Sequence, residues 1–161
     1  MTINIDNYDS PLGPMLIAGD GASLVGLWFY GQRFFPSELV SLAVEAPDVV
    51  TGSVKHWLDV YFSGMIPDFC PNLSPVGSPF RLSVWHQLLQ IPYAHTATYG
   101  SVAATLHSSP LAVGGAVARN PISIIIPCHR VIGSNGSLTG YAGGLSRKQW
   151  LLNHEARCKS N

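Results

Sequence analysis

The chain has 161 residues, of which 47% are apolar and 11% are charged, with a formal net charge of zero. A chain of this length forms one domain or two small ones, and this composition excludes a disordered protein. Its apolar runs are far shorter than the ~18 residues of a membrane span, and the N-terminal sequence MTINIDNYDS lacks the basic and apolar regions of a secretory signal.

The charge is divided unequally along the chain. Residues 1–68 contain two basic and eight acidic side chains, whereas residues 69–161 contain seven basic side chains and one acid, Glu155. This asymmetry fits a polyanionic partner of the basic half, or two independently solvated surfaces. Six of the seven basic residues lie between 119 and 159, which favours a functional face.

The first part of the chain has the pattern of a small α/β unit. Apolar runs at 15–18 and 24–30 are separated by Gly19-Asp20-Gly21, which predicts two strands joined by a turn. Residues 37–46 and 53–62 have helical spacing. The segment 64–79 contains four Pro and two Gly, which indicates a linker. We therefore predict domains at 1–73 and 74–161.

The second part has mainly helical patterns. Ser78-Pro79 predicts the start of a helix that ends at Ile91-Pro92. Helical runs at 99–106 and 111–119 follow and suggest a helix-turn-helix, although helical hairpins unrelated to DNA have the same pattern. We then expect a buried extended stretch at 123–126, a turn at 133–136 and an amphipathic helix at 145–156.

The cysteines predict neither a disulfide framework nor a zinc site. Cys70, Cys128 and Cys158 are far apart, and no CxxC or HExxH motif occurs. We therefore expect a reducing compartment, the cytoplasm or the nucleus of a eukaryote, and no bound metal.

The most informative segment is 120–130, NPISIIIPCHR, in which Cys128 is followed by His129 and Arg130. A thiol needs a base or a nearby positive charge to act as a nucleophile at neutral pH, and these two neighbours provide both. The alternative is a buried structural cysteine that packs like a small apolar residue.

The segment 127–131, PCHRV, resembles the active-site signature of the O6-alkylguanine-DNA alkyltransferases, also called methylated-DNA–protein-cysteine methyltransferases. Segments 74–104, 112–121 and 140–155 resemble, in order, the start of that family's C-terminal domain, its recognition helix and its closing segment. Segments 10–15 and 60–64 are weaker matches to its first domain. The chain is identified as a member of this family.

The resemblance implies an α+β chain. Its N-terminal domain is expected to be RNase H-like, with a short antiparallel sheet plus helix, and its C-terminal domain mostly helical with a winged-helix-like helix-turn-helix. The implied activity is DNA repair by irreversible, single-turnover transfer of an alkyl group from O6-alkylguanine in duplex DNA to Cys128, with O4-alkylthymine as a second candidate substrate. No cofactor, membrane or obligate protein partner is implied, and a monomer is expected.

The resemblance also implies residue roles. Cys128 accepts the alkyl group, His129 acts as its base through a water, and Glu155 orients the imidazole. Asn120 braces the turns around the site, and Tyr99 donates a hydrogen bond to the departing guanine. The expected base pocket consists of Pro127, Val131, Ser134, Tyr141, Ala142 and Gly143. The expected minor-groove contacts, around a flipped base, come from Tyr99, Leu111, Ala112, Gly114, Gly115, Arg119 and Arg130.

Two features depart from the family pattern. Leu111 stands where the family usually has an Arg that fills the gap left by the flipped base, and the turn at 106–110 is about two residues shorter than usual. Either flipping is less efficient here, or Arg119 or another cation substitutes. Two other functions remain as rivals: a damage sensor that binds alkylated DNA without transfer, which usually has Trp at the Cys128 position, and a thiol hydrolase unrelated to DNA.

Overall fold

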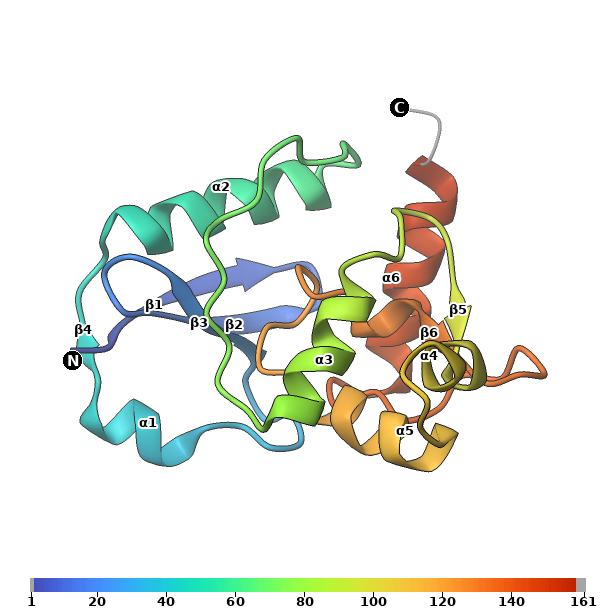
Figure 1. Cartoon of the computed structure of the whole chain (residues 1–161). Helices are drawn as coiled ribbons and strands as arrows, with labels where there is room; N and C mark the ends of the chain where they lie inside the picture. The colour runs from blue at the N-terminus through green and yellow to red at the C-terminus, as the bar shows by residue number, and fades with distance from the viewer. Residues whose placement is uncertain (1, 159–161) are drawn as a thin grey trace. The chain divides into compact units, whose positions relative to one another are not determined.

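The structure, a computed structural model, describes residues 2–158 and divides into two compact units between Val76 and Gly77 (Figure 1). The N-terminal unit is a sheet with two helices, and the C-terminal unit is mostly helical. None of the helices in the described range is both long and apolar enough to span a bilayer.

The N-terminal unit contains a four-stranded sheet with the strand order β3-β2-β1-β4. The strands β1, β2 and β3 form an antiparallel meander, and β4 pairs parallel with β1 at the edge. Their bounds are Asn4–Ser10 for β1, Gly13–Gly19 for β2, Leu24–Phe29 for β3 and Val44–Glu45 for β4.

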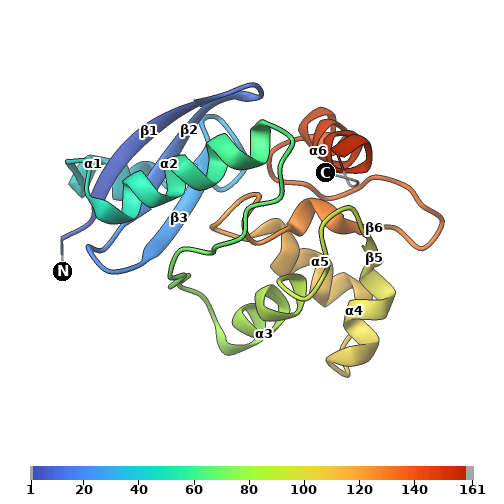
Figure 2. The same cartoon turned by 90° about the horizontal axis from the view of Figure 1, so that it is seen from above.

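The two helices of this unit cover opposite faces of the sheet (Figure 2). Helix α2 (Val49–Phe62) buries Val54, Leu58 and Tyr61. Helix α1 (Ser37–Leu42) packs Leu39 against a cluster formed by Ile5, Leu16, Ala18 and Trp28. Because both faces of β2 and β3 are covered, these strands appear in the sequence as continuous apolar runs instead of alternating patterns.

Two sequence-based expectations in this unit are corrected, and one strand was not predicted. The predicted helix 37–46 ends at Leu42, since Val44 N donates to Ile3 O (3.0 Å) and pulls β4 into the sheet. The predicted helix 53–62 begins at Val49, because the Asp48 side chain caps it. Strand β1, whose sequence NIDNYDS is mostly polar, was not predicted and forms through backbone pairing with β2.

The predicted helices of the C-terminal unit are confirmed. They are α3 (Pro79–Leu88), α4 (Tyr99–Thr105), α5 (Pro110–Ala118) and α6 (Leu145–Cys158). Ser78, Thr98 and Ser109 cap the first three by accepting hydrogen bonds from backbone N–H groups. Helices α4 and α5 form the helix-turn-helix, and α3 is joined to α5 by the indole N–H of Trp85, which donates to Ala116 O (2.8 Å).

Within the C-terminal unit, a two-stranded parallel ladder connects the helix-turn-helix to the segment that contains Cys128. Strand β5 (Ala97–Thr98) leads into α4, and it pairs with β6 (Val131–Ile132), which directly follows a 3₁₀ turn at Cys128–Arg130. The ladder therefore places the start of the helix-turn-helix beside the end of the cysteine motif.

The prediction of an extended stretch at 123–126 is wrong. These residues are buried but form a turn, in which Ile124 has a φ of 70°, in the left-handed region that β-branched residues rarely adopt. The predicted turn at 133–136 is confirmed, with Gly136 N donating to Gly133 O (2.9 Å).

The cap of α2 provides a test of the N-terminal unit. The Asp48 carboxylate accepts hydrogen bonds from Thr51 N and from the Asn4 side chain, both at 2.9 Å. We expect Asp48→Ala to lower the free energy of unfolding by about 1–2 kcal/mol, measured by urea denaturation. Asp48→Asn, which keeps an acceptor at the cap, should retain most of the stability. Equal losses in both variants would show that the cap is not the cause.

Candidate active site around Cys128

The turn that precedes Cys128 is built on the side chain of Asn120. Its amide nitrogen donates to Ile122 O (3.1 Å) and Ile126 O (2.9 Å), and its oxygen accepts from Ile122 N (3.0 Å). These bonds close the loop that holds Ile124 in its left-handed conformation. Asn120 is itself buried, so an amide at this position satisfies backbone groups that water cannot reach. These three hydrogen bonds have the geometry expected of a residue that braces the turns around the site.

Cys128 lies at the end of this loop and is 4% exposed. Burial raises the pKa of its thiol to about 11. The Asn120 side chain, the charge of Lys148 and the backbone N–H groups of Cys128 and His129 act in the opposite direction. The free thiol is therefore protonated at neutral pH, and the site needs a base to make it a nucleophile.

His129 is the group that fits a base. Its Nε2 lies 2.6 Å from an oxygen of Glu155, whereas its buried Nδ1 has no hydrogen-bond partner among the described residues. Burial lowers the pKa of His129, and this outweighs the opposing effect of Glu155, so the ring is neutral at pH 7. A neutral ring that donates from Nε2 to a carboxylate presents a free lone pair at Nδ1, which can accept a proton.

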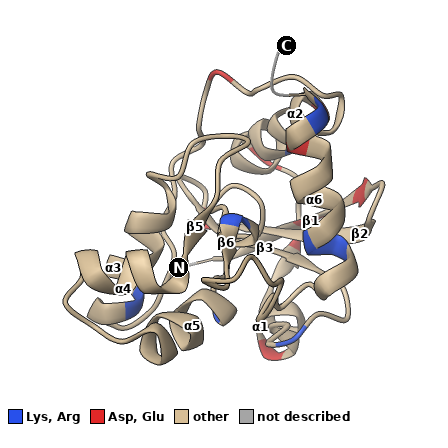
Figure 3. Cartoon of the chain, turned by 90° about the vertical axis from the view of Figure 1, so that its right-hand side faces the viewer, with Lys and Arg blue, Asp and Glu red and all other residues tan. Residues whose placement is uncertain are grey.

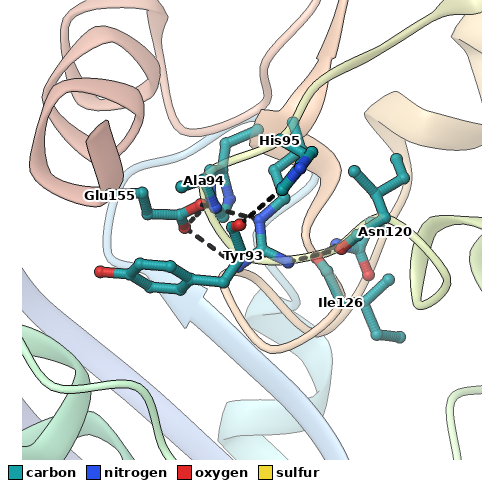
Figure 4. A network of polar contacts seen from close by, with 9 residues as sticks. Tyr93, Ala94, His95, Asn120, Ile126 and Glu155 are labelled. Carbon is teal, nitrogen blue, oxygen red and sulfur yellow. Dashed lines mark hydrogen bonds and ion pairs between the residues drawn. The ribbon is translucent and has the colours of Figure 1, made fainter. Parts of the chain in front are cut away.

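Glu155, on α6, is 1% exposed and is hydrogen-bonded by donors from two other segments, the loop at Ala94 and the turn at 128–130 (Figure 4). One oxygen accepts from Ala94 N (3.1 Å) and Arg130 Nε (2.8 Å), and the other accepts from a terminal nitrogen of Arg130 (3.1 Å) and faces His129. Although burial alone raises the pKa of Glu155, the hydrogen bonds from His129 and Arg130 and the charge of Arg130 hold it well below its usual range. The carboxylate is therefore ionised, and Arg130 balances its charge.

This arrangement argues against the predicted contact of Arg130 with DNA, which stays a prediction. Its guanidinium is buried, makes two bonds to Glu155, and donates from its other terminal nitrogen to Ile91 O (2.8 Å). Three of the five N–H donors of Arg130 are therefore committed to acceptors inside the unit. The proposed positive charge beside the thiol also comes from another residue, because Glu155 neutralises Arg130.

The positive charge beside the thiol belongs to Lys148, a residue of the helix predicted at 145–156. The Lys148 side chain is fully buried, and its ammonium donates to Val131 O and to Thr139 O (2.9 Å). Burial lowers the pKa of Lys148 to about 8. The spacing of Lys148, Leu151 and Glu155 (i, i+3, i+7) places all three on one face of α6, and this period was the signal that could have identified Lys148.

Tyr99, at the start of α4, lies next to both the recognition helix and the cysteine loop. Its hydroxyl donates to Thr139 O (2.8 Å). A Cβ atom on Gly114 of α5 would lie 3.9 Å from its ring, and one on Gly140 would lie 3.1 Å from its hydroxyl. The phenol is therefore in ordinary contact range of α5, and the absence of a side chain at Gly140 lets its hydroxyl approach the 139–143 segment closely.

The remaining pocket candidates differ in exposure. Pro127, Val131, Tyr141 and Gly143 are buried, Ala142 is half-buried, and Ser134 is exposed in the turn at 133–136. Charge on the Cys128 sulfur is close enough to raise the pKa of Tyr141, which burial already places well above its usual value. Between residues 2 and 158, no cluster of three or more His, Cys, Asp or Glu side chains could hold a metal ion.

The outward face of α5 consists of small residues around one large side chain. Leu111 is 88% exposed, and Ala112, Gly115 and Arg119 are also exposed. Figure 3 shows basic residues on α6 as well, but the buried Lys148 is one of them. With Arg130 and Lys148 inside the fold, the basic character of the C-terminal surface is weaker than the sequence suggests.

Comparisons with known proteins agree over nearly the whole chain. Residues 79–157 match the 6-O-methylguanine DNA methyltransferase DNA binding domain, and residues 5–73 match the ribonuclease-like domain of the same family. The methylated-DNA–protein-cysteine methyltransferase of Methanosarcina acetivorans is 41% identical over 160 residues, covering 94% of this chain and 97% of the relative. The protein of that name from Mycobacterium leprae is 42% identical, covering 95% and 92%.

Solved structures give the same result. The O6-methylguanine methyltransferase of Mycobacterium tuberculosis is 40% identical with a TM-score of 0.86, covering 97% of this chain and 94% of that one. A second structure, of Mycobacterium tuberculosis OGT in complex with DNA, is 37% identical with a TM-score of 0.86, covering 98% and 94%.

The internal role of Arg130 predicts a large effect on stability. We expect Arg130→Met to lower the free energy of unfolding by about 3–5 kcal/mol, because it leaves the buried Glu155 carboxylate without its countercharge. The matched control is Arg157→Met, which removes an exposed cation from α6 and should change the stability by less than about 0.5 kcal/mol. Urea denaturation of both variants measures the difference, and similar values would contradict the internal role of Arg130.

Proposed function

The chain belongs to the 6-O-methylguanine DNA methyltransferase family, and we propose that it repairs DNA by moving an alkyl group from O6 of guanine to the sulfur of Cys128. The observation that carries this proposal is the buried Cys128–His129–Glu155 arrangement, in which an ionised carboxylate orients a neutral imidazole beside a thiol. The resemblance to an OGT in complex with DNA supports the DNA-binding part.

The chemical step is a displacement at the carbon attached to O6. The proton of the Cys128 thiol passes, through a water, to the free Nδ1 of His129, and the sulfur attacks the alkyl carbon. The S–C bond forms as the C–O bond breaks, and the bonding electrons leave with guanine. Tyr99 donates a hydrogen bond to the departing base and so stabilises the charge that develops on it.

The product limits the protein to one turnover. The thioether has no leaving group that His129 or Glu155 can displace, so the alkylated protein is not regenerated. One chain contains the nucleophile, the base and the helix-turn-helix, so the proposal needs no cofactor and no second protein. The reaction is stoichiometric.

The target base is inside a duplex and must be flipped out before it reaches a buried thiol. The small exposed residues of α5, Ala112 and Gly115, let its backbone approach the minor groove closely. We expect Arg119, which is exposed at the end of α5, to contact a phosphate. Tyr99 lies beside Gly114 of the same helix, so the helix that binds DNA borders the residue that assists the leaving base.

Transfer is tested directly by mass. Incubation with a duplex containing O6-methylguanine should add one methyl group to the peptide that contains Cys128. Cys128→Ala should abolish the mass gain and retain DNA binding, because binding depends on α5 and the surface cations. Cys70→Ala and Cys158→Ala are the matched controls and should react like the wild type. Methylation of Cys128→Ala at another cysteine would contradict the assignment, and duplex binding without any mass gain in the wild type would indicate a damage sensor.

The exposed Leu111 leads to a prediction about the gap that a flipped base leaves in the stack of DNA bases. An apolar wedge can unstack bases but cannot hydrogen-bond the orphaned cytosine. We therefore expect Leu111→Arg to raise the rate of transfer from duplex DNA, and to steepen the salt dependence of binding by about one phosphate contact or less. Transfer from free O6-benzylguanine, which needs no flipping, should stay nearly constant. Equal stimulation with both substrates would place the effect on the thiol instead, and no change with either would show that residue 111 does not reach the stack.

A further inference from the structure

Lys148 is a buried cation without a carboxylate partner. Its side chain is fully buried, and Glu155 is the only acidic residue of the C-terminal unit in the described range. Both oxygens of Glu155 are already engaged by His129, Arg130 and Ala94. Burying a charge costs free energy, so packing alone does not explain an ammonium at this position.

The partners of the ammonium are two backbone carbonyls at the ends of one segment. Val131 O lies three residues after Cys128, and Thr139 O lies just before the 140–143 segment that contains Tyr141. Lys148 therefore joins both ends of the 131–139 segment. The turn at 133–136 lies between these ends and is exposed. The two hydrogen bonds of the ammonium therefore hold the two ends of the segment in place.

The Thr139 carbonyl has a second donor, the hydroxyl of Tyr99. The two bonds have similar lengths, 2.9 Å from Lys148 Nζ and 2.8 Å from the phenol. The ammonium also lies 5.7 Å from the centroid of the Tyr99 ring, within the range of a cation–π contact. Lys148 and Tyr99 thus meet at one acceptor.

We propose that Lys148 is a positioning residue for alkyl transfer, which acts by holding the Thr139 carbonyl so that the Tyr99 hydroxyl can exchange it for the departing guanine. This inference rests on the proposed function. In the free protein the phenol donates to Thr139. When a base enters, the same hydroxyl turns to the base, and Lys148 keeps the carbonyl hydrogen-bonded and in place.

The physical reason is the position of the Thr139 carbonyl. Thr139 is exposed, so water can replace the phenol as a donor, but a water molecule does not hold the segment in one place. A charge-assisted bond from Lys148 is stronger than a neutral one. It keeps the carbonyl, and with it the end of the 131–139 segment, in the same position when the phenol turns to the base.

The test is a double-mutant cycle with free O6-benzylguanine, in which single-turnover rates at increasing substrate concentration separate binding from chemistry. Lys148→Met, which keeps the length of the side chain, should lower the maximal rate about 10- to 100-fold with a smaller change in apparent affinity. In the Tyr99→Phe background, which has no hydroxyl to donate to the base, the same substitution should lower the maximal rate by less than about 3-fold. Arg157→Met, an exposed cation on the same helix, is the control and should change neither value.

Each outcome decides the inference. Equal fold-losses in the two Tyr99 backgrounds would show that Lys148 only supports the fold, and an unchanged rate in Lys148→Met would show that the ammonium is not used; both overturn the proposal. If Lys148→Met does not fold, Lys148→Gln, which keeps two N–H donors without the charge, is taken through the same cycle. Wild-type protein that gains no methyl mass at Cys128 from a duplex containing O6-methylguanine would reject the proposed function itself, so the two failures are distinguishable.

Discussion

The ion pair between Glu155 and Arg130 is the interaction on which the cysteine site depends. The carboxylate comes from α6, and its donors come from the 91–94 loop and from the 3₁₀ turn that contains Cys128 and His129. Because Arg130 balances the charge of Glu155, the carboxylate can stay ionised without protonating His129. The imidazole therefore remains neutral, which is the state that a base requires. Arg130 follows His129 directly in sequence, so one short motif supplies both the base and the countercharge of its orienting acid.

The burial of Cys128 has a chemical consequence for a protein that is used once. A thiol whose pKa is raised to about 11 is almost entirely protonated at neutral pH and reacts slowly with solvent electrophiles. Activation then depends on a substrate that fills the pocket next to the base. The strained backbone at Ile124 and the amide of Asn120 hold the thiol in this protected position. The structure thus favours selectivity over intrinsic thiol reactivity.

Helix α6 connects the two sides of the site. Its buried face presents Glu155 to the imidazole and, two turns earlier, Lys148 to the carbonyls of the pocket wall. Both ionisable groups are inside the fold, so α6 contributes less to the surface potential than its sequence implies. The surface that we propose for DNA is α5 with its small residues, the exposed Leu111 and Arg119. Binding through so few cations is expected to depend on shape and close approach more than on charge.

The sequence by itself determined the elements with strong local signals and the identity of the chemistry. The Ser78-Pro79 cap signal and helical periods predicted α3 to α6, and the PCHR segment indicated the nucleophile and its base. Only the tertiary structure decided the features that depend on distant partners: strand β1, which is polar and forms because β2 is beside it; the turn at 123–126, which the side chain of Asn120 imposes on apolar residues; and the roles of Arg130 and Lys148. A basic side chain looks the same in a sequence whether it faces solvent or a buried acceptor, and the acceptors here, Glu155, Val131 O and Thr139 O, come from other segments of the fold.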